Sequence, residues 1–258
     1  MASFPAVLRS EWTKIRTVAS TSWTLATTLL VTVGIGAGLC AVVNATFDNM
    51  PKPEQASFDA TQMSFSGMIL GQLAMLVFGA MVVGSEYGTG MIRTSLAAVP
   101  RRGGLLLGKV LVATALALVV GLATGFLSFF LGQALLGGHS TGLGGENVLR
   151  AVIGVGLYMA LLAAFAIGAS MMLRNSAASI ALLIGFFLIL PIVLSLVEAT
   201  RKVAAYLPGQ AGSAIMQTVP AAAGSDVPYG PWGGLGIMAL WTLAAVIGGY
   251  LVLGKRDA

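Results

Sequence analysis

Six long apolar stretches, separated by shorter polar segments, run along the chain. A bilayer core needs about 20 apolar residues of helix, and each stretch is long enough to cross it. Helix is the expected state, because an open sheet leaves backbone groups unpaired in hydrocarbon. The pattern predicts an all-α integral membrane protein that forms one domain over residues 1–258, with spans at about 22–43, 65–84, 105–131, 151–173, 177–197 and 232–253.

The composition supports a membrane protein and disfavours metal chemistry. Hydrophobic residues make up 57% of the chain and charged residues only 9%, whereas soluble domains carry about 25% charged residues. Cys40 and His139 are the only cysteine and the only histidine. The sequence therefore offers neither a thiolate cluster nor a multi-histidine site, and no metal is expected.

The net charge of +5 is compatible with a nucleic-acid partner or with a membrane protein that has one basic side. With both termini placed inside, ten of the 14 lysines and arginines fall on the inner side, and six of the nine acidic residues fall on the outer side. This asymmetry follows the positive-inside rule. We therefore expect cytoplasmic N- and C-termini in a plasma membrane, contact with lipid, and no nucleic-acid partner. The inner basic residues are Arg9, Lys14, Arg16, Arg93, Arg101, Arg102, Lys109, Arg174, Lys255 and Arg256.

The segment ahead of the first span is amphipathic. Its apolar positions recur every three or four residues, which places them on one helical face. We predict a helix in the membrane interface, with Leu8 and Trp12 toward the membrane and with Lys14 and Arg16 facing anionic lipid. A plain extension of the first span is the alternative. The apolar positions are Phe4, Leu8, Trp12 and Ile15.

The link between the second and third spans, residues 85–104, is too polar to span and has a helical pattern. Its apolar positions share one face, Thr89 and Arg93 point elsewhere, and Pro100 stops the helix. A short amphipathic helix of this kind can dock into a groove on a soluble partner. The alternative is an ordinary positive-inside loop with a solvated Glu86. The apolar positions are Ile92, Leu96 and Val99.

The outer side contains one long segment with a pattern of its own. Residues 198–231 are moderately apolar, and we expect short helices there that dip into the outer leaflet. In the preceding span, Pro191 should kink or loosen the helix.

Pairs of glycines four residues apart recur in three of the predicted spans. Small residues let membrane helices approach closely. We expect each pair to mark a helix contact, within one subunit or between two. The pairs are Gly34 and Gly38, Gly67 and Gly71, and Gly121 and Gly125.

The two cytoplasmic segments also carry a family resemblance. The chain resembles bacterial ABC type-2 permease subunits in the sequence Ser10-Glu11-Trp12-Thr13-Lys14-Ile15-Arg16 ahead of span one, and in Glu86-Tyr87-Gly88-Thr89-Gly90-Met91-Ile92-Arg93 with the following Leu96-Ala97-Ala98-Val99-Pro100-Arg101-Arg102. The six spans, the inner termini and the length of 258 residues fit this family over the whole chain.

The resemblance implies an architecture and a set of partners. The N-terminal segment is then the connecting helix, the 85–100 link holds a coupling helix that fits a nucleotide-binding subunit, and residues 198–231 supply short outer helices. Two permease subunits, identical or different, pair and work with two copies of a separate ATPase chain. Substrate passes between the permeases, lined mainly by spans one, two and five, at residues that the sequence does not identify. The residues assigned to coupling are Glu86, Tyr87, Thr89, Arg93 and Leu96.

No nucleotide or cofactor site is expected in this chain. Residues 103–110 match most of a phosphate-binding loop, but Val110 replaces the Ser or Thr hydroxyl that would hold magnesium. The resemblance places ATP and Mg²⁺ on the partner ATPase, so this chain has no nucleotide-binding domain and is not an enzyme by itself.

The predicted spans carry almost no ionisable side chains, which bears on the energy source. An ion-coupled carrier needs a charged group within the membrane, so their near absence favours an ATP-driven exporter. It also favours a hydrophobic or amphipathic substrate, such as a drug, an antibiotic, a peptide or a lipid-like molecule. The main alternative is an ion-coupled multidrug transporter. A membrane-embedded enzyme and a non-transporting sensor are further alternatives, although a single histidine and scattered carboxylates make an enzyme a poor fit.

Overall fold

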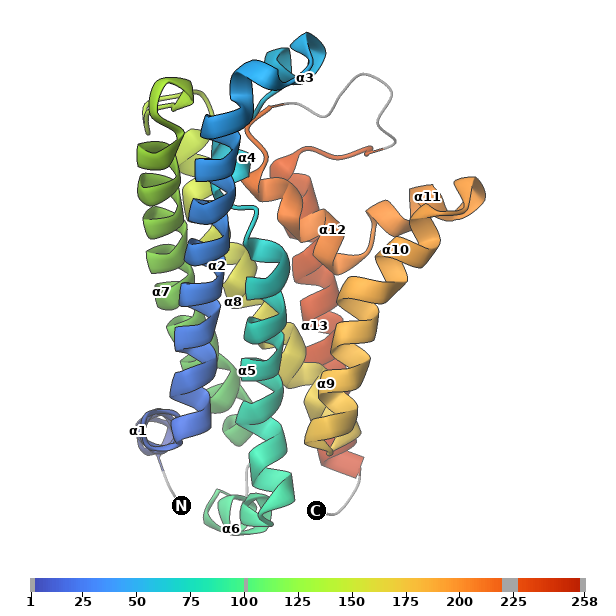
Figure 1. Ribbon diagram of the computed structural model, residues 1–258. Helices are drawn as coiled ribbons and strands as arrows, with labels where there is room; N and C mark the ends of the chain where they lie inside the picture. The colour runs from blue at the N-terminus through green and yellow to red at the C-terminus, as the bar shows by residue number, and fades with distance from the viewer. Residues whose placement is uncertain (1–2, 100–101, 220–226, 256–258) are drawn as a thin grey trace.

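A computed structural model describes residues 3–99, 102–219 and 227–255, and these residues are helical with no strands. Six helices are long and apolar enough to cross a membrane, and they agree with the six predicted spans to within a few residues (Figure 1). The fifth span runs through three consecutive segments. The spans are α2 (Ala19–Thr46), α5 (Met68–Gly88), α7 (Arg102–Leu136), α8 (Val148–Leu173), the fifth span with α9 (Ser176–Ile184), η3 (Gly185–Ile189) and α10 (Leu190–Ser195), and α13 (Pro231–Lys255).

Helix α8 is the centre of the bundle. Most of its length is buried, and it packs against α5, α7 and α13. The peripheral helices leave large apolar side chains exposed, for example Leu240 of α13 at 68%. A soluble protein rarely exposes so much contiguous apolar surface, whereas lipid solvates it. The bundle therefore has a closely packed interior and an apolar outer surface, as expected for a protein embedded in lipid.

Glycine allows several of these helices to approach one another. A Cβ atom on Gly67 or Gly71 would collide with Thr32 of α2. A Cβ atom on Gly121 or Gly125 of α7 would meet the backbone of α8, where Gly156 and Val152 lie. These two glycine pairs therefore lie at close helix contacts.

The third pair lies elsewhere. Gly34 and Gly38 are exposed on α2, and no atom of the described chain lies within 4 Å of a Cβ placed on either residue. Gly36 is instead the residue of α2 that lies close to a neighbour, the carbonyl of Ser64.

The fifth span is interrupted where the sequence predicted a disturbance. Residues Gly185–Ile189 form a π-helical turn directly before α10, and Pro191 lies in the first turn of α10. Proline has no N–H to bond the carbonyl four residues earlier, so the regular helical ladder is broken there. Wider π turns of this kind occur often at functional sites.

Both ends of the described chain lie at one end of the bundle, together with α1 (Phe4–Thr17) and α6 (Met91–Ala98) (Figure 1). Gly90 has a φ of 71°, the left-handed conformation that glycine adopts freely, and it turns the chain from α5 into α6. Helix α6 ends at Ala98. Pro100 and Arg101 lie outside the described residues, as does Arg256.

The opposite end of the bundle is covered by short helices. Short helices occupy residues 198–216 of the long segment after the fifth span, as expected, and residues 47–64, between the first two spans, form a 3₁₀ turn and two short α-helices. Asp59 begins the second of these, because its carboxylate accepts hydrogen bonds from the backbone N–H groups of Thr61 and Gln62. The elements are η1 (Phe47–Asn49), α3 (Lys52–Ala56), α4 (Ala60–Ser64), η2 (Gly137–His139), α11 (Glu198–Ala205), α12 (Pro208–Ser213) and η4 (Ala214–Met216).

Candidate functional site

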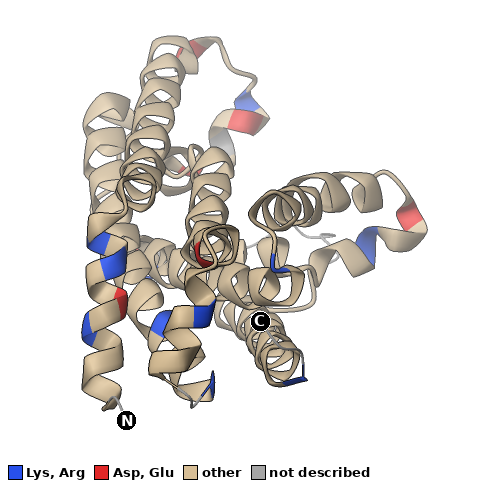
Figure 2. Ribbon diagram, turned by 90° about the horizontal axis from the view of Figure 1, so that it is seen from below, with Lys and Arg blue, Asp and Glu red and all other residues tan. Residues whose placement is uncertain are grey.

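Four charged side chains from three helices meet at the end of the bundle where α1 lies. Glu11 and Lys14 come from α1, Glu86 from the last turn of α5, and Lys109 from α7. Figure 2 shows from this end that charged positions gather on α1 and around the neighbouring helix ends. Glu11, Glu86 and Lys109 are only 1–2% exposed, which is unusual for ionised side chains. We call these four residues the charge cluster.

Lys109 forms the buried half of the charge cluster. Its Nζ lies 2.6 Å from Glu11 Oε2 and 2.8 Å from Glu86 Oε1, and it also donates to the carbonyl of Val82 at 3.4 Å. All three ammonium protons therefore have an acceptor. A buried charge is tolerated when it is paired and fully hydrogen-bonded in this way.

Lys14 forms the accessible half of the charge cluster. Its Nζ lies 2.7 Å from Glu11 Oε1 and 2.8 Å from Glu86 Oε1, and it donates its third hydrogen bond to Ser95 Oγ of α6 at 3.1 Å. The Lys14 side chain is 25% exposed. Burial alone would lower the pKa of Lys14, but the hydrogen bonds and charges of Glu11 and Glu86 outweigh it and raise that pKa. Lys14 is therefore charged at neutral pH.

One oxygen of the charge cluster has no hydrogen-bond partner among the described residues. Glu86 Oε2 is buried and accepts no hydrogen bond from a described residue. A small cavity of about 20 Å³ lies against Glu86, Lys14 and Lys109. A volume of this size holds one water molecule when polar partners are present, so hydration can satisfy this oxygen.

The position of α1 follows from which of its faces packs on the bundle. Val7, Glu11 and Ile15 recur at intervals of four residues and are buried. Gly108 of α7 faces Val7 without a side chain of its own, which lets α1 approach closely. Of the predicted apolar positions, Phe4 and Trp12 are 40% and 47% exposed, whereas Ile15 is buried. The face of α1 that packs on the protein therefore combines Val7 and Ile15 with the carboxylate of Glu11, and it coincides only partly with the apolar face that the sequence predicted.

This orientation changes the expected role of one interfacial residue. Arg16 is exposed and Leu8 is half-buried, which is compatible with a helix at a membrane surface. Lys14 was expected to face anionic lipid, but its ammonium group turns inward to two carboxylates. The reason is that Glu11 is buried on the packed face of α1, where an unpaired charge is costly. Lys14, three residues later, pairs with this carboxylate and so turns away from the lipid.

Sequence reasoning missed Glu11 and Lys109 as site residues. The expectation that the spans carry almost no ionisable groups left Lys109 without a role, although this lysine lies within the third span and is 1% exposed. A lone lysine inside an apolar stretch, with one acidic residue on each of two other helices on the same side, was the available signal.

The residues assigned to coupling divide into a buried group and an exposed group. Glu86 is 2% exposed, so the alternative of a solvated Glu86 is excluded. The Tyr87 hydroxyl donates to Met171 Sδ at 3.9 Å, and the guanidinium of Arg174 lies 5.7 Å from the ring of Tyr87. Leu96 packs on the apolar cluster of Val7, Ile92 and Leu105.

The exposed group lies on the protein surface around α6. Thr89 is exposed and bonds only to the carbonyl of Ser85, one turn earlier in its own helix. Arg93 is exposed as well, and so is Met91, at 37%. This surface is the part of the link that is accessible to another protein.

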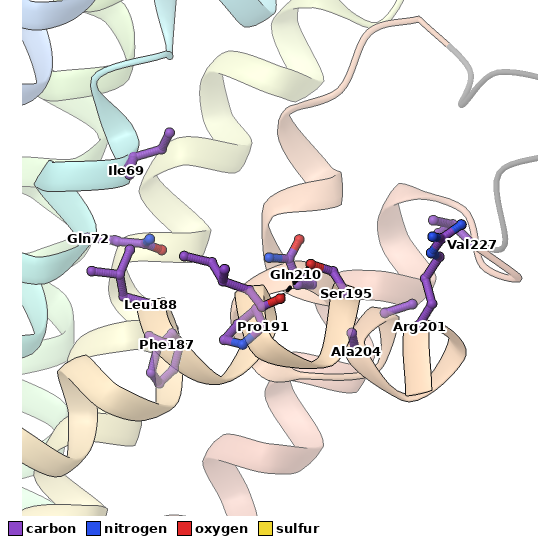
Figure 3. Close-up of a pocket in the computed structure, with 12 residues that line it drawn as sticks. Ile69, Gln72, Phe187, Leu188, Pro191, Ser195, Arg201, Ala204, Gln210 and Val227 are labelled. Atoms are coloured by element: carbon purple, nitrogen blue, oxygen red, sulfur yellow. Dashed lines mark hydrogen bonds between the residues drawn. The ribbon is translucent and has the colours of Figure 1, made fainter. Parts of the chain in front are cut away.

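A cavity of about 660 Å³ lies beside α5 and the fifth span, away from the charge cluster (Figure 3). It is lined by α5, by the π turn and α10 of the fifth span, and by α11 and α12. An adjoining cavity of about 330 Å³ shares four lining residues with it, namely Ile69, Gln72, Phe187 and Gln210. Spans two and five were expected to line the substrate path, and both contribute here. The described lining residues include none from α2, the first span.

The larger cavity has a mainly apolar lining with a few polar groups, whereas polar side chains make up about half of the lining of the smaller one. The hydroxyl of Tyr158, which is fully buried in α8, donates to Gln72 Oε1 at 2.6 Å and lies 3.4 Å from the carbonyl of Gly209. Because Tyr158 occupies the carbonyl oxygen of Gln72, the amide N–H groups of Gln72 remain available as donors. Arg201 lies near Val227 at the outer margin of the lining (Figure 3).

The sequence profile of a family described as "ABC-2 family transporter protein" matches residues 7–193. The chain belongs to the ABC-2 transporter family. Members of this family are typically the non-catalytic membrane component of a transporter and work with an ATPase partner. A search of curated proteins returned no significant match.

The matched range of this ABC-2 protein extends from α1 into α10. It therefore contains the whole charge cluster, the exposed surface of α6 and, apart from Ser195, the residues of spans two and five that line the cavities. The sequence resemblance to ABC type-2 permeases is confirmed at the level of the family.

Proposed function

We propose that this ABC-2 protein is the membrane-spanning subunit of an ATP-driven exporter in a bacterial plasma membrane. Two permease subunits, identical or different, associate with two copies of a separate ATPase that binds ATP and Mg²⁺. The permease contributes one membrane domain over residues 1–258, with its termini on the ATPase side. The family match over residues 7–193 is the observation that carries this proposal.

The position of α6 supports a contact with the ATPase at this end of the bundle. Ile92 of α6 is buried against Val7 and Leu105, so the helix is fixed to the membrane domain by its apolar face. Its opposite face exposes Thr94 and Arg93. A short helix that is anchored on one face and exposed on the other can be held in a groove of a partner. In this proposal α6 is the coupling helix and α1 the interfacial connecting helix.

The cavities support a neutral or amphipathic substrate. In the larger cavity, apolar side chains such as Ile69 and Phe187 give most of the lining, Gln72 and Gln210 add uncharged hydrogen-bonding groups, and Arg201 places one positive charge at the margin. Ligand sites are commonly built in this way, with an apolar wall and a few placed polar groups. Drugs, antibiotics, peptides and lipid-like molecules with hydrogen-bond acceptors fit this lining. Export from the cytoplasm or the inner leaflet is the proposed direction.

Ion-coupled transport is the second function to weigh, because the charge cluster supplies buried carboxylates. Both Glu11 and Glu86 accept hydrogen bonds from two lysines. Each carboxylate is therefore held in charge-assisted hydrogen bonds to ammonium groups. A cluster whose opposite charges already pair with one another suits a structural junction better than a proton carrier.

Copurification tests the partner and the energy source. The tagged chain is expressed in its native host, extracted in mild detergent, and assayed for copurified ATPase and for Mg²⁺-dependent ATP hydrolysis. We expect a complex, and Arg93→Glu should reduce the bound ATPase, whereas Arg9→Glu, which reverses an exposed charge on α1, should not.

Transport in inverted vesicles tests the function itself. We expect ATP-dependent movement of the amphipathic dye Hoechst 33342 that persists when an ionophore collapses the proton gradient. Failure to bind an ATPase, or dye transport that stops with the gradient while ATP remains, would contradict the proposal. The second result would favour an ion-coupled carrier.

A further inference from the structure

Helix α6 is joined to the rest of the protein by two kinds of contact. The first is apolar, because Ile92 packs with Val7 of α1 and Leu105 of α7. The second is polar, because Lys14 of α1 donates a hydrogen bond to Ser95 Oγ across 81 positions of the sequence. Among the described residues, this is the side-chain hydrogen bond that connects α6 to the charge cluster.

The two lysines of the charge cluster differ in what they hold. Lys109 is 1% exposed, and its acceptors belong to α1 and α5. Lys14 is 25% exposed and divides its three protons between two carboxylates and Ser95. Two charge-assisted bonds fix the ammonium group of Lys14, so the third proton points in a defined direction, toward α6. Lys109 thus fixes the helices to one another, and Lys14 extends this junction to α6.

We propose that Lys14 is a positioning residue that transmits movement of α6 to α1 through its hydrogen bond to Ser95. A displacement of α6 pulls on Lys14, and the carboxylates of Glu11 and Glu86 carry the displacement into α1 and the end of α5. The inference rests on the proposed function for the origin of the displacement, which is an ATPase acting on α6. The apolar contact keeps α6 folded against the bundle when the polar link is absent.

The sequence provides close control variants for this idea. Ser95→Ala removes the acceptor on α6 and leaves the charges of the cluster balanced. Thr94→Ala removes the neighbouring hydroxyl, which bonds only to the carbonyl of Met91 in its own helix. Lys14→Met and Arg16→Met each remove one positive charge from α1, but exposed Arg16 takes no part in the charge cluster.

The test follows α1 and α6 separately by spin-label distances. Cys40 is the only cysteine and is replaced by alanine, and labels are placed at Thr13 of α1 and Ala97 of α6. Each is paired in turn with a label at Leu251 of α13, and all three label positions are exposed. The complex of the full chain with its ATPase is measured in lipid nanodiscs, without nucleotide and with ATP plus vanadate.

In the wild-type complex, nucleotide should shift both distances. In Ser95→Ala and Lys14→Met, the Ala97 distance should still shift and the Thr13 shift should be lost. Thr94→Ala and Arg16→Met should behave like wild type, and Ser95→Thr, which keeps the hydroxyl, should restore the Thr13 shift. A merely structural defect would alter both distances together, so the separation of the two distances is specific to transmission.

Two results would overturn the inference. The first is a Thr13 shift in Ser95→Ala and Lys14→Met that equals the shift in their controls, because the apolar contact then carries the movement alone. The second is the absence of a shift in the wild-type complex. If no ATPase binds, the proposed function fails. The hydrogen bond between Lys14 and Ser95 is then tested in the chain without a partner. A Thr13–Ala97 distance distribution that broadens in Ser95→Ala and not in Thr94→Ala supports the link, and equal widths refute it.

Discussion

Lys109 of α7 and Glu11 of α1 form a buried ion pair, with 2.6 Å between Nζ and Oε2 and about 1% exposure of each side chain. The two residues are 98 positions apart in the sequence. The same ammonium group binds Glu86 of α5. One lysine therefore joins the N-terminal helix, the end of the second span and the start of the third. Such a junction is stable only while it is complete, because a buried charge without its partner is costly.

Removal of Lys109 should destabilise the protein strongly. Lys109→Met leaves Glu11 and Glu86 with Lys14 alone, and loss of one partner of a buried ion pair costs about 3–5 kcal/mol. The free energy of unfolding in mixed detergent micelles measures this loss. Lys52→Met, which removes an exposed lysine, is the control and should change little. Equal stability of the two variants would show that the charge cluster is not a stabilising junction.

The glycine pairs should differ in their tolerance of a side chain. Gly125→Leu places atoms against the carbonyl of Val152, which cannot move cheaply, and overpacking of this kind costs about 1–3 kcal/mol. Gly34→Leu fills open space, so stability within one chain should change by less than about 0.5 kcal/mol. Thermal unfolding in detergent distinguishes the two. A loss of dimer in Gly34→Leu at unchanged chain stability would identify that face of α2 as a contact between subunits.

Asp59 should tie the first outer loop to the segment that follows η4. Its Oδ1 caps α4, and its Oδ2 accepts hydrogen bonds from the hydroxyl and the N–H of Thr218 and from the N–H of Val219. Asp59→Ala loses both functions, and loss of the cap alone costs about 0.5–2 kcal/mol. Faster amide exchange in residues 60–64 and 214–219 is the expected result.

Two further variants separate the functions of Asp59. Asp59→Asn retains a carbonyl that can cap α4 but presents an amide to donors, so exchange should accelerate mainly in residues 214–219. Glu54→Ala, an exposed neighbour, serves as the control. Protection that is unchanged in Asp59→Ala would argue against the tie.

The contribution of Lys14 to stability should persist to high pH. Partners in the folded protein raise the pKa of Lys14 above its ordinary value of 10.5. A raised lysine pKa contributes stability that is fully present below the unfolded value and is lost as the pH rises through the folded value. The difference in melting temperature between wild type and Lys14→Met should therefore stay constant up to about pH 10 and shrink above it. A difference that already declines near neutral pH would contradict the paired state of Lys14.

The sequence determined the helices and the spans because these depend on local properties. An apolar stretch of sufficient length must become a helix in a membrane, wherever the other helices lie. The six predicted spans consequently match the observed helices to within a few residues. The helical periods of residues 4–15 and 92–99 likewise placed helices in the segments of α1 and α6. Family membership was accessible for the same reason, because the motifs are contiguous.

The tertiary structure alone decided which charged residues meet. Pattern analysis assigns the charges of an amphipathic helix to the polar surroundings, so it directed Lys14 outward and gave Glu11 no role. It also gave no role to Lys109, which lies within an apolar span. Their inward positions depend on Glu86, which comes from another helix.

The outer cavities also required the assembled bundle. Gln72 and Tyr158 are 86 positions apart, yet they share a hydrogen bond beside the fifth span. The sequence by itself therefore determined a six-span helical membrane protein, and only the packing decided where its charge cluster and its cavities lie. The physical reason is that burial in lipid acts on each span separately, whereas ion pairs and cavities need side chains from several helices at once.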